Sequence, residues 1–190
     1  MKLIVALGNP SEKYSKTRHN AGFMALDFYL KEQIPAFNAK FNADILKIGD
    51  VIFAKPQTFM NASGEAVKRI ADFYKISEML VLHDDLDLPL GAVRFKFGGG
   101  NAGHNGLKSI DNLFSNQYTR IRIGIGKPSD DSDKNANKNA VINFVLEDFS
   151  QSEREALQDS FEIIANAIDA FIQGESLAVL QNRYSKRKSQ

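Results

Sequence analysis

Short apolar runs alternate with stretches of helical periodicity along the chain. The run at residues 79–82 is continuous and β-prone, which predicts a buried parallel strand, whereas two later runs alternate apolar with cationic residues and predict strands with one polar face. The predicted strands are residues 2–7, 43–48, 51–55, 79–82, 92–97 and 119–125. Gly49 and Asp50 separate the second and third strands, so we expect these two to form a hairpin.

The other stretches repeat apolar residues three or four positions apart, as an amphipathic helix does. The predicted helices are residues 20–31, 63–74, 107–114, 141–145, 150–172 and 177–180. Asn20 and Ser63 are the predicted N-caps of the first two helices. Ser150 and Glu153 form a capping-box pattern at the start of the longest helix.

Length and composition predict one globular domain, residues 1–190, since 43% of the 190 residues are hydrophobic and 25% are charged. Within it, residues 127–139 are polar and predict a mobile loop, and the basic tail 183–190 is expected to be frayed. The absence of cysteine excludes disulfides, thiolate metal sites and a cysteine nucleophile. The apolar N-terminal run ends at Gly8, too early for a signal peptide or a membrane span. We therefore expect a cytoplasmic protein with no membrane partner. The formal net charge of +1 means that any RNA binding depends on where the cations lie.

The densest polar chemistry lies between His83 and Leu107, where a predicted strand ends in three aspartates and a glycine-rich stretch follows. Residues 98–103 formally match the dinucleotide-binding fingerprint. The match is weak, because the acidic residue expected roughly 20 positions later is replaced by arginines. The Gly-Lys-Ser/Thr ending of a phosphate-binding loop is also missing. A nucleotide cofactor is therefore disfavoured.

A metal site is a second interpretation of the same stretch, with candidate ligands His83, Asp84, Asp85, Asp87 and His104. Alternation along an extended segment would point Asp84 and Asp85 to opposite sides, and no His-x-x-x-His spacing is present. A metal is therefore not expected. The sequence also has no Gly-x-Ser-x-Gly elbow, which disfavours a serine nucleophile.

A histidine at a helix start offers a third chemistry. His19 precedes the predicted helix 20–31, whose positive N-terminal end disfavours the imidazolium and holds the ring neutral, as a general base requires. A strand-end aspartate could fix its tautomer while asparagine amides stabilise an oxyanion, which suits water attacking an activated carbonyl. Two cation pairs would suit a substrate that carries phosphates: Arg94 with Lys96, and Arg120 with Arg122. The pattern alone leaves open a solvated loop histidine and a solvated sheet face.

Three blocks of the sequence closely resemble the bacterial peptidyl-tRNA hydrolase family: residues 8–22, residues 55–64 and the stretch that ends Gly103-His104-Asn105-Gly106-Leu107. They occur in the family's order. The resemblance implies a monomeric α/β domain with a twisted mixed β-sheet flanked by helices, and no cofactor. It also implies an activity, cleavage of the ester that joins a peptide to the 3′ end of tRNA, which recycles tRNA from stalled translation. The expected partner is peptidyl-tRNA.

The resemblance also assigns roles to individual positions. His19 would be the base that activates water, Asp84 the carboxylate that keeps His19 basic, and Asn9 a group that distinguishes N-blocked peptidyl esters from free aminoacyl esters. The expected contacts to the peptidyl-adenosine end are Tyr14, Phe59, Met60, Asn61 and Asn105. The expected clamp for the 5′ phosphate of tRNA is Lys96 and Arg122, joined by Arg94. Residues 127–149 match the family's substrate-side lid.

Ser11 departs from the family pattern, which usually has glycine after Asn-Pro. A serine there is expected to tighten the turn and shift Asn9. Two rival functions remain at this point, a non-catalytic RNA-binding protein that uses the same cations and a metal-dependent hydrolase. Turnover of a peptidyl-tRNA would exclude the first, and turnover that survives a strong chelator would exclude the second.

Overall fold

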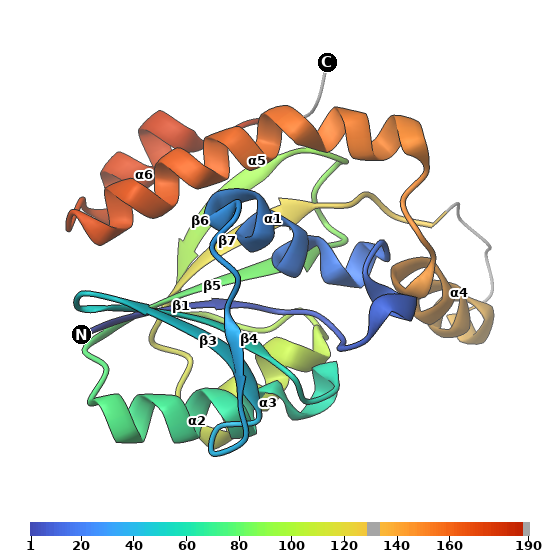
Figure 1. Ribbon diagram of the computed structural model, residues 1–190. Coiled ribbons are helices and arrows are strands. Elements are labelled where there is room, and N and C mark those ends of the chain that lie inside the picture. The colour runs from blue at the N-terminus through green and yellow to red at the C-terminus, as the bar shows by residue number, and fades with distance from the viewer. Residues whose placement is uncertain (129–133, 188–190) are drawn as a thin grey trace.

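The computed structural model describes residues 1–128 and 134–187. Its strands form one seven-stranded sheet in the order β2-β3-β4-β1-β5-β7-β6 (Figure 1). They are β1 (Lys2–Ala6), β2 (Ala36–Asn38), β3 (Ala43–Ile48), β4 (Val51–Pro56), β5 (Glu78–Asp85), β6 (Val93–Phe97) and β7 (Thr119–Gly124). β1 is parallel to β4 and β5, and β5 is parallel to β7, whereas the other pairs are antiparallel. The sheet is therefore mixed, as the family resemblance implies.

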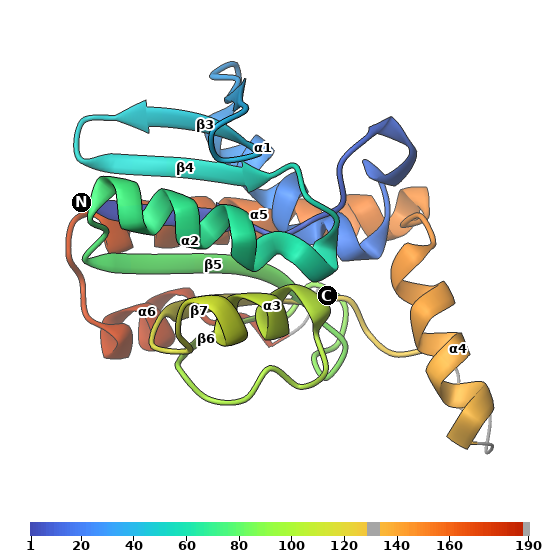
Figure 2. The same ribbon diagram turned by 90° about the horizontal axis from the view of Figure 1, so that it is seen from below.

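Helices cover both faces of the sheet. α1 (Ala21–Leu30), α5 (Gln151–Ile172) and α6 (Leu177–Tyr184) lie on one face, and α2 (Ser63–Tyr74) and α3 (Asn105–Leu113) lie on the other (Figure 1). α4 (Lys134–Leu146) stands beyond the edge where the parallel strands end (Figure 2). Within residues 1–128 and 134–187 there are also three 3-10 turns: η1 (Glu12–Tyr14), η2 (Arg18–Asn20) and η3 (Met60–Ala62). Among the described helices, none combines the length and the apolar character that a membrane span needs.

Two hydrophobic cores, one on each face, explain the continuous apolar runs of the central strands. Ile4 and Ala6 of β1 pack into the core under α1 and α5, and Leu3 and Val5 pack into the core over α2 and α3. β5 divides its side chains in the same way. A strand with helices on both faces needs apolar residues at every position, so β1 and β5 lack the alternation of a half-exposed strand.

The predicted strands and helices are found, with two differences. The short strand β2 was not predicted, because Ala36 and Phe37 are exposed and give no buried pattern. The predicted loop 127–139 is wrong from Lys134 onward, where α4 begins, while residues 129–133 lie outside the described part of the chain. Polar residues open α4, which hid its start from a reading based on apolar spacing.

The helix starts confirm one predicted cap and correct two. Ser150 and Glu153 form the predicted capping box at the start of α5. Asn20 and Ser63 do not cap their helices with their side chains. The hydroxyl of Ser63 instead donates to the carbonyl of Met60 at 2.9 Å, and the side chain of Asn20 bonds to the backbone of Asn9.

The predicted frayed tail is wrong as far as Lys186. α6 extends through Tyr184, and Lys186 then forms an antiparallel bridge with Val93, the first residue of β6. The two backbone hydrogen bonds of this bridge have N···O distances of 2.9 and 3.0 Å. Residues 188–190 lie outside the described part of the chain.

Candidate active site

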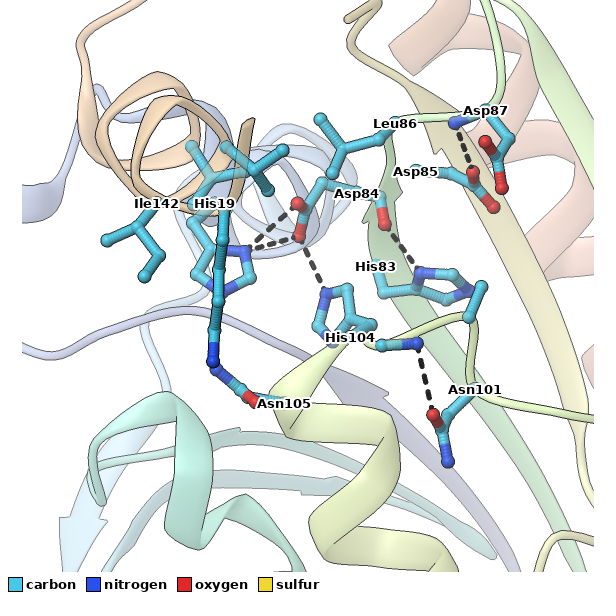
Figure 3. Close-up of a pocket in the computed structure, with 15 residues that line it drawn as sticks. His19, His83, Asp84, Asp85, Leu86, Asp87, Asn101, His104, Asn105 and Ile142 are labelled. Carbon is cyan, nitrogen blue, oxygen red and sulfur yellow. Dashed lines mark hydrogen bonds and ion pairs between the residues drawn. The ribbon is translucent and has the colours of Figure 1, made fainter. Parts of the chain in front are cut away.

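The site is built where the two central strands end. β1 and β5 are parallel neighbours with Ala6 beside Leu82, so the turns that follow them meet at one edge of the sheet. The chain after β1 leads to η2, which holds His19, and β5 ends on Asp84 and Asp85. As predicted from the alternation of a strand, the two aspartates diverge: Asp84 points toward His19, and Asp85 points to the other face (Figure 3).

His19 and Asp84 form a buried pair. Nδ1 of His19 lies 2.9 Å from each carboxylate oxygen of Asp84, and the residues are 8% and 2% exposed. Burial lowers the pKa of His19, but the charge of Asp84 and the hydrogen bond to it raise that pKa more, so it lies above 6.5. Burial raises the pKa of Asp84, but His19 and then His104 outweigh it and hold that pKa far below its usual value. With Nδ1 bound to an ionised carboxylate, Nε2 of His19 is the ring nitrogen available to the pocket.

His104 is the second imidazole on Asp84. Its Nε2 lies 2.8 Å from Oδ1 of Asp84 (Figure 3). Its Nδ1 accepts hydrogen bonds from the amides of Gly106 and Leu107 at 3.1 and 3.3 Å. His104 is therefore the N-cap of α3. Because Nδ1 accepts from two amides, the neutral ring must carry its proton on Nε2 and donate it to Asp84. Asp84 thus receives hydrogen bonds from two rings and has a fixed orientation.

The cluster His19, Asp84 and His104 has ligand atoms within 4.8 Å of one another, the composition of a metal site. The tautomer of His104 argues against that use. Nε2 could coordinate a metal only as a lone-pair donor, and the proton would then have to sit on Nδ1, facing the amides of Gly106 and Leu107. The residues present therefore do not fit a metal at His104.

The other candidate metal ligands that the sequence offered are held elsewhere. Nδ1 of His83 donates to the carbonyl of Asp84 at 2.7 Å, while its Nε2 has no hydrogen-bond partner among the described residues. Burial, and next the charge of His104, lower the pKa of His83 to about 3. Asp85 pairs with Nε of Arg122 at 2.7 Å, and Asp87 pairs with Lys127 at 3.0 Å. These carboxylates do not converge with the histidines on one point.

Asn9 is fixed from two sides. Its side-chain oxygen accepts from the amide of Met60 at 2.9 Å, and its backbone forms two hydrogen bonds with the side chain of Asn20, at 2.8 and 3.0 Å. Ser11, two residues later, has φ 86° and ψ 153°, which is glycine-like backbone. The strain therefore lies in the backbone of Ser11 itself, and the expected shift of Asn9 stays a prediction. Sequence reasoning missed the role of Asn20, since Asn before a helix suggests a cap.

A pocket of about 380 Å³ opens beside His19. Apolar side chains of Leu86 and α4 form much of its wall, together with Asp84, His104 and Asn105 (Figure 3). The other residues expected to contact substrate do not line this pocket: Tyr14, Phe59, Met60 and Asn61. Met60 is buried and bonds to Asn9, whereas Phe59 is 60% exposed and meets the ring of Tyr14 edge to face, with centroids 6.5 Å apart. Of the predicted substrate contacts, only Asn105 lines the pocket, and the other four lie outside it.

The predicted cations face one side of β6 and β7, with Arg94 opposite Arg122 and Lys96 opposite Arg120. Lys96 is exposed. Arg122 is bound to Asp85, and Nη1 of Arg94 donates to the carbonyl of Lys186 at 2.7 Å. Arg120 is buried and donates to the carbonyls of Gly99 and Gly100 at 2.7 and 2.8 Å, so it shapes the glycine-rich loop from within the protein.

Arg18, next to His19, was not singled out from the sequence. Its guanidinium donates to the carbonyl of Phe144 at 3.1 Å, to Glu147 at 3.2 Å and to both carboxylate oxygens of Glu153 at 3.2 Å. It also lies 4.2 Å from the ring centre of Phe144. These contacts join the end of α4 and the start of α5 to the turn that carries His19. Partners more than 120 residues away leave no local signal in the sequence.

A histidine held by a buried carboxylate, with its second nitrogen facing an open pocket, has the geometry of a general base, and hydrolases are one class of enzyme that uses such a group. The comparison with known proteins agrees. The chain belongs to the peptidyl-tRNA hydrolase family, whose model, described as Peptidyl-tRNA hydrolase, matches residues 3–190.

Individual relatives and solved structures bear this out. A protein named peptidyl-tRNA hydrolase from Helicobacter pylori (strain P12) is 48% identical over 190 residues, covering 99% of this chain and 97% of that protein. One of the same name from Aliarcobacter butzleri is 50% identical over 174 residues, covering 90% of this chain and 91% of that protein. The crystal structure of peptidyl-tRNA hydrolase from Acinetobacter baumannii matches with a TM-score of 0.86 and 32% identity, covering 100% of this chain and 97% of that one. The predicted family and fold class are confirmed.

Proposed function

We propose that this protein hydrolyses the ester bond between the peptide and the 3′ end of tRNA in peptidyl-tRNA. Membership of the family supports the substrate. The observation that carries the mechanism is the buried pair in which Asp84 binds Nδ1 of His19 at 2.9 Å and leaves Nε2 for a water. That water would attack an ester carbonyl bound next to it.

In the proposed reaction, Nε2 of His19 removes a proton from water as the oxygen bonds to the ester carbonyl carbon. The carbonyl oxygen becomes an oxyanion. When the intermediate collapses, the bond to the ribose 3′ oxygen breaks, and the proton passes from Nε2 to that oxygen. The products are a peptide carboxylic acid, which ionises, and tRNA with a free 3′ hydroxyl. Asp84 stabilises the transient imidazolium and fixes its orientation.

Three asparagines are proposed to position the substrate. Asn9 offers its side-chain amide beside Met60, where it would distinguish N-blocked from free amino esters, and its oxygen is already engaged at 2.9 Å. Asn61 and Asn105 are exposed, and Asn105 lines the pocket beside His19; both would orient the water and the carbonyl. Amide groups suit this task because they donate to a developing oxyanion without titrating.

We further propose that the reaction needs no metal and no other cofactor, and that the protein acts as a monomer in the cytoplasm. The N-cap role of His104 supports the first point, because it commits Nε2 to donation toward Asp84. Turnover measured after dialysis against a strong chelator tests it. Loss of turnover that returns with a divalent metal would favour the rival metal hydrolase.

Release of free tRNA from a purified N-blocked aminoacyl-tRNA tests the function. The parent protein should turn over steadily, and His19→Ala should lose roughly 100- to 10,000-fold in rate, the range of a general base, while tRNA binding stays largely intact. Near-parent turnover by His19→Ala would refute the mechanism. Salt-sensitive binding without product from the parent protein would favour an RNA-binding protein instead.

Lys96 and Arg122 are proposed to bind the 5′ phosphate of the tRNA. Both lie on one face of the β6–β7 pair. Loss of either should weaken binding of whole tRNA but spare short ester substrates, because the contact is charge-assisted and remote from the chemistry. Equal losses on both substrates would contradict the assignment.

A further inference from the structure

The C-terminal segment is attached to the sheet. The backbone of Lys186 pairs with Val93, and the side chain of Gln181 donates to the carbonyl of Phe95 at 3.2 Å. Nη1 of Arg94 adds a hydrogen bond to the carbonyl of Lys186 at 2.7 Å. The segment therefore covers the outer side of β6, the strand at the end of the sheet, whose outward-facing backbone groups would otherwise be unpaired.

The register sets the direction of this segment. Val93 begins β6, directly after the loop that leaves the end of β5, and Leu86 and Asp87 of that loop line the pocket. Because the bridge is antiparallel, the chain beyond Lys186 runs back toward the same loop. Arg187 is thereby directed to the edge of the sheet where the active site lies.

The segment is strongly basic, with Arg183, Lys186, Arg187 and Lys188 within six residues. The ammonium of Lys186 is turned toward α5, 3.4 Å from the hydroxyl of Ser160 and 3.9 Å from Asp159. Arg183 and Arg187 are exposed. A protein with a formal net charge of only +1 thus gathers exposed cations on the segment that covers β6.

We propose that Arg183 and Arg187 form a second phosphate-binding surface, which contacts the RNA backbone of the substrate, and that Arg94 acts by holding this segment in place. The proposal rests on the proposed function, since an ester bound at His19 brings the end of the RNA to this edge. Phosphate contacts fix the register of a nucleic acid on a protein without reading its sequence. Arg94, predicted as a clamp residue, would thus serve the clamp indirectly through its bond to Lys186.

The test compares the parent with a variant carrying Arg183→Gln and Arg187→Gln, on whole N-blocked aminoacyl-tRNA and on a short 3′ ester of the same blocked amino acid. For whole tRNA we expect KM to rise roughly five- to tenfold, and the slope of log kcat/KM against log salt to fall by about 1 to 2. The short ester should be cleaved as by the parent. The matched control carries Lys31→Gln and Lys75→Gln. These two cations are also exposed, but they follow the C-terminal ends of α1 and α2, at the opposite end of the strands from the active site.

Three results would overturn the proposal: whole-tRNA KM within twofold of the parent, an equal loss on the short ester, or an equal loss in the lysine control. The role of Arg94 is tested by adding Arg94→Met to the double variant. If Arg94 acts through the segment, the triple variant should be no worse than the double, whereas a further multiplied loss would show a direct contact. Absence of turnover by the parent would refute the proposed function instead, so the two failures are distinguishable.

Discussion

Replacing Ser11 with glycine should stabilise the protein without changing its activity. At φ 86° and ψ 153°, Ser11 occupies a region that is almost exclusive to glycine, and a side chain there costs about 1–3 kcal/mol. Glycine also makes the unfolded chain more flexible, which lowers the free energy of unfolding by about 0.4–1 kcal/mol and so offsets part of the gain. The net gain is about 1 kcal/mol in the free energy of unfolding, which raises Tm by about 2–4 °C for a chain of this length.

The gain is measured by thermal unfolding of the Ser11→Gly variant, with a separate Lys75→Gly variant as the control. Lys75 also has a positive φ, but at φ 54° and ψ 54° it lies in the left-handed helical region at the end of α2, where a side chain is less strained. Its replacement should therefore give less than half the rise in Tm. The kcat/KM of Ser11→Gly should stay within twofold of the parent, because Asn9 is fixed by Asn20 and Met60. An unchanged or lower Tm would contradict the claim that the backbone of Ser11 is strained. A changed kcat/KM would show that the strain at Ser11 also displaces Asn9.

The remaining predictions concern the proposed base and its supports. Since Asp84 raises the pKa of His19 above 6.5 and the neutral ring is the base, kcat/KM should fall on acidification with a midpoint above pH 6.5. Asp84→Asn should lower the rate and move that midpoint to lower pH, and a midpoint that stays in place in the pH profile would contradict the pairing. Because the pKa of His19 is raised in the folded protein, the His19–Asp84 pair contributes stability that is fully present below pH 6.5 and is lost as the pH rises through the folded-state pKa. Chemical denaturation of the parent and of Asp84→Asn across this pH range measures the contribution. His104→Ala should lower kcat roughly tenfold or more, because Asp84 loses a hydrogen-bond donor. It should also destabilise α3 by about 1 kcal/mol, because the helix loses its N-cap. An unchanged kcat would indicate that His19 alone orients Asp84. Arg18→Lys keeps the charge but loses the forked contact, so kcat should fall several-fold with the acid midpoint unchanged, whereas Arg154→Lys, which alters a contact to the carbonyl of Phe149, should leave kcat alone.

The parts of the fold that could be predicted are those with a local pattern. The apolar runs of β1 and β5, the hairpin of β3 and β4 and the capping box of α5 all depend on residues close in sequence. The divergence of Asp84 and Asp85 followed from strand alternation alone. β2 and the start of α4 could not be predicted, because their residues are exposed or polar and do not repeat at a buried spacing.

The site was predictable in its residue types but not in its connections. Sequence reasoning singled out His19, Asp84 and Asn9, and their catalytic roles remain predictions. It considered His104 only as a metal ligand, because the two amides that fix its tautomer become visible only when α3 is seen to begin at Asn105. The pairing of Arg94 with Lys186 depends on a strand-like bridge across 92 residues, which no local pattern encodes.

Because the proposed site depends on both β1 and β5, it can assemble only late in the synthesis and folding of the chain. His19 and Asp84 are 65 positions apart: His19 lies in η2, which follows β1, and Asp84 lies on β5, the strand that pairs with β1. A polypeptide synthesised only as far as β4 holds the imidazole with nothing to orient it. The proposed base and its carboxylate can therefore act together only after β1 and β5 have paired, which would make turnover a sensitive measure of correct folding.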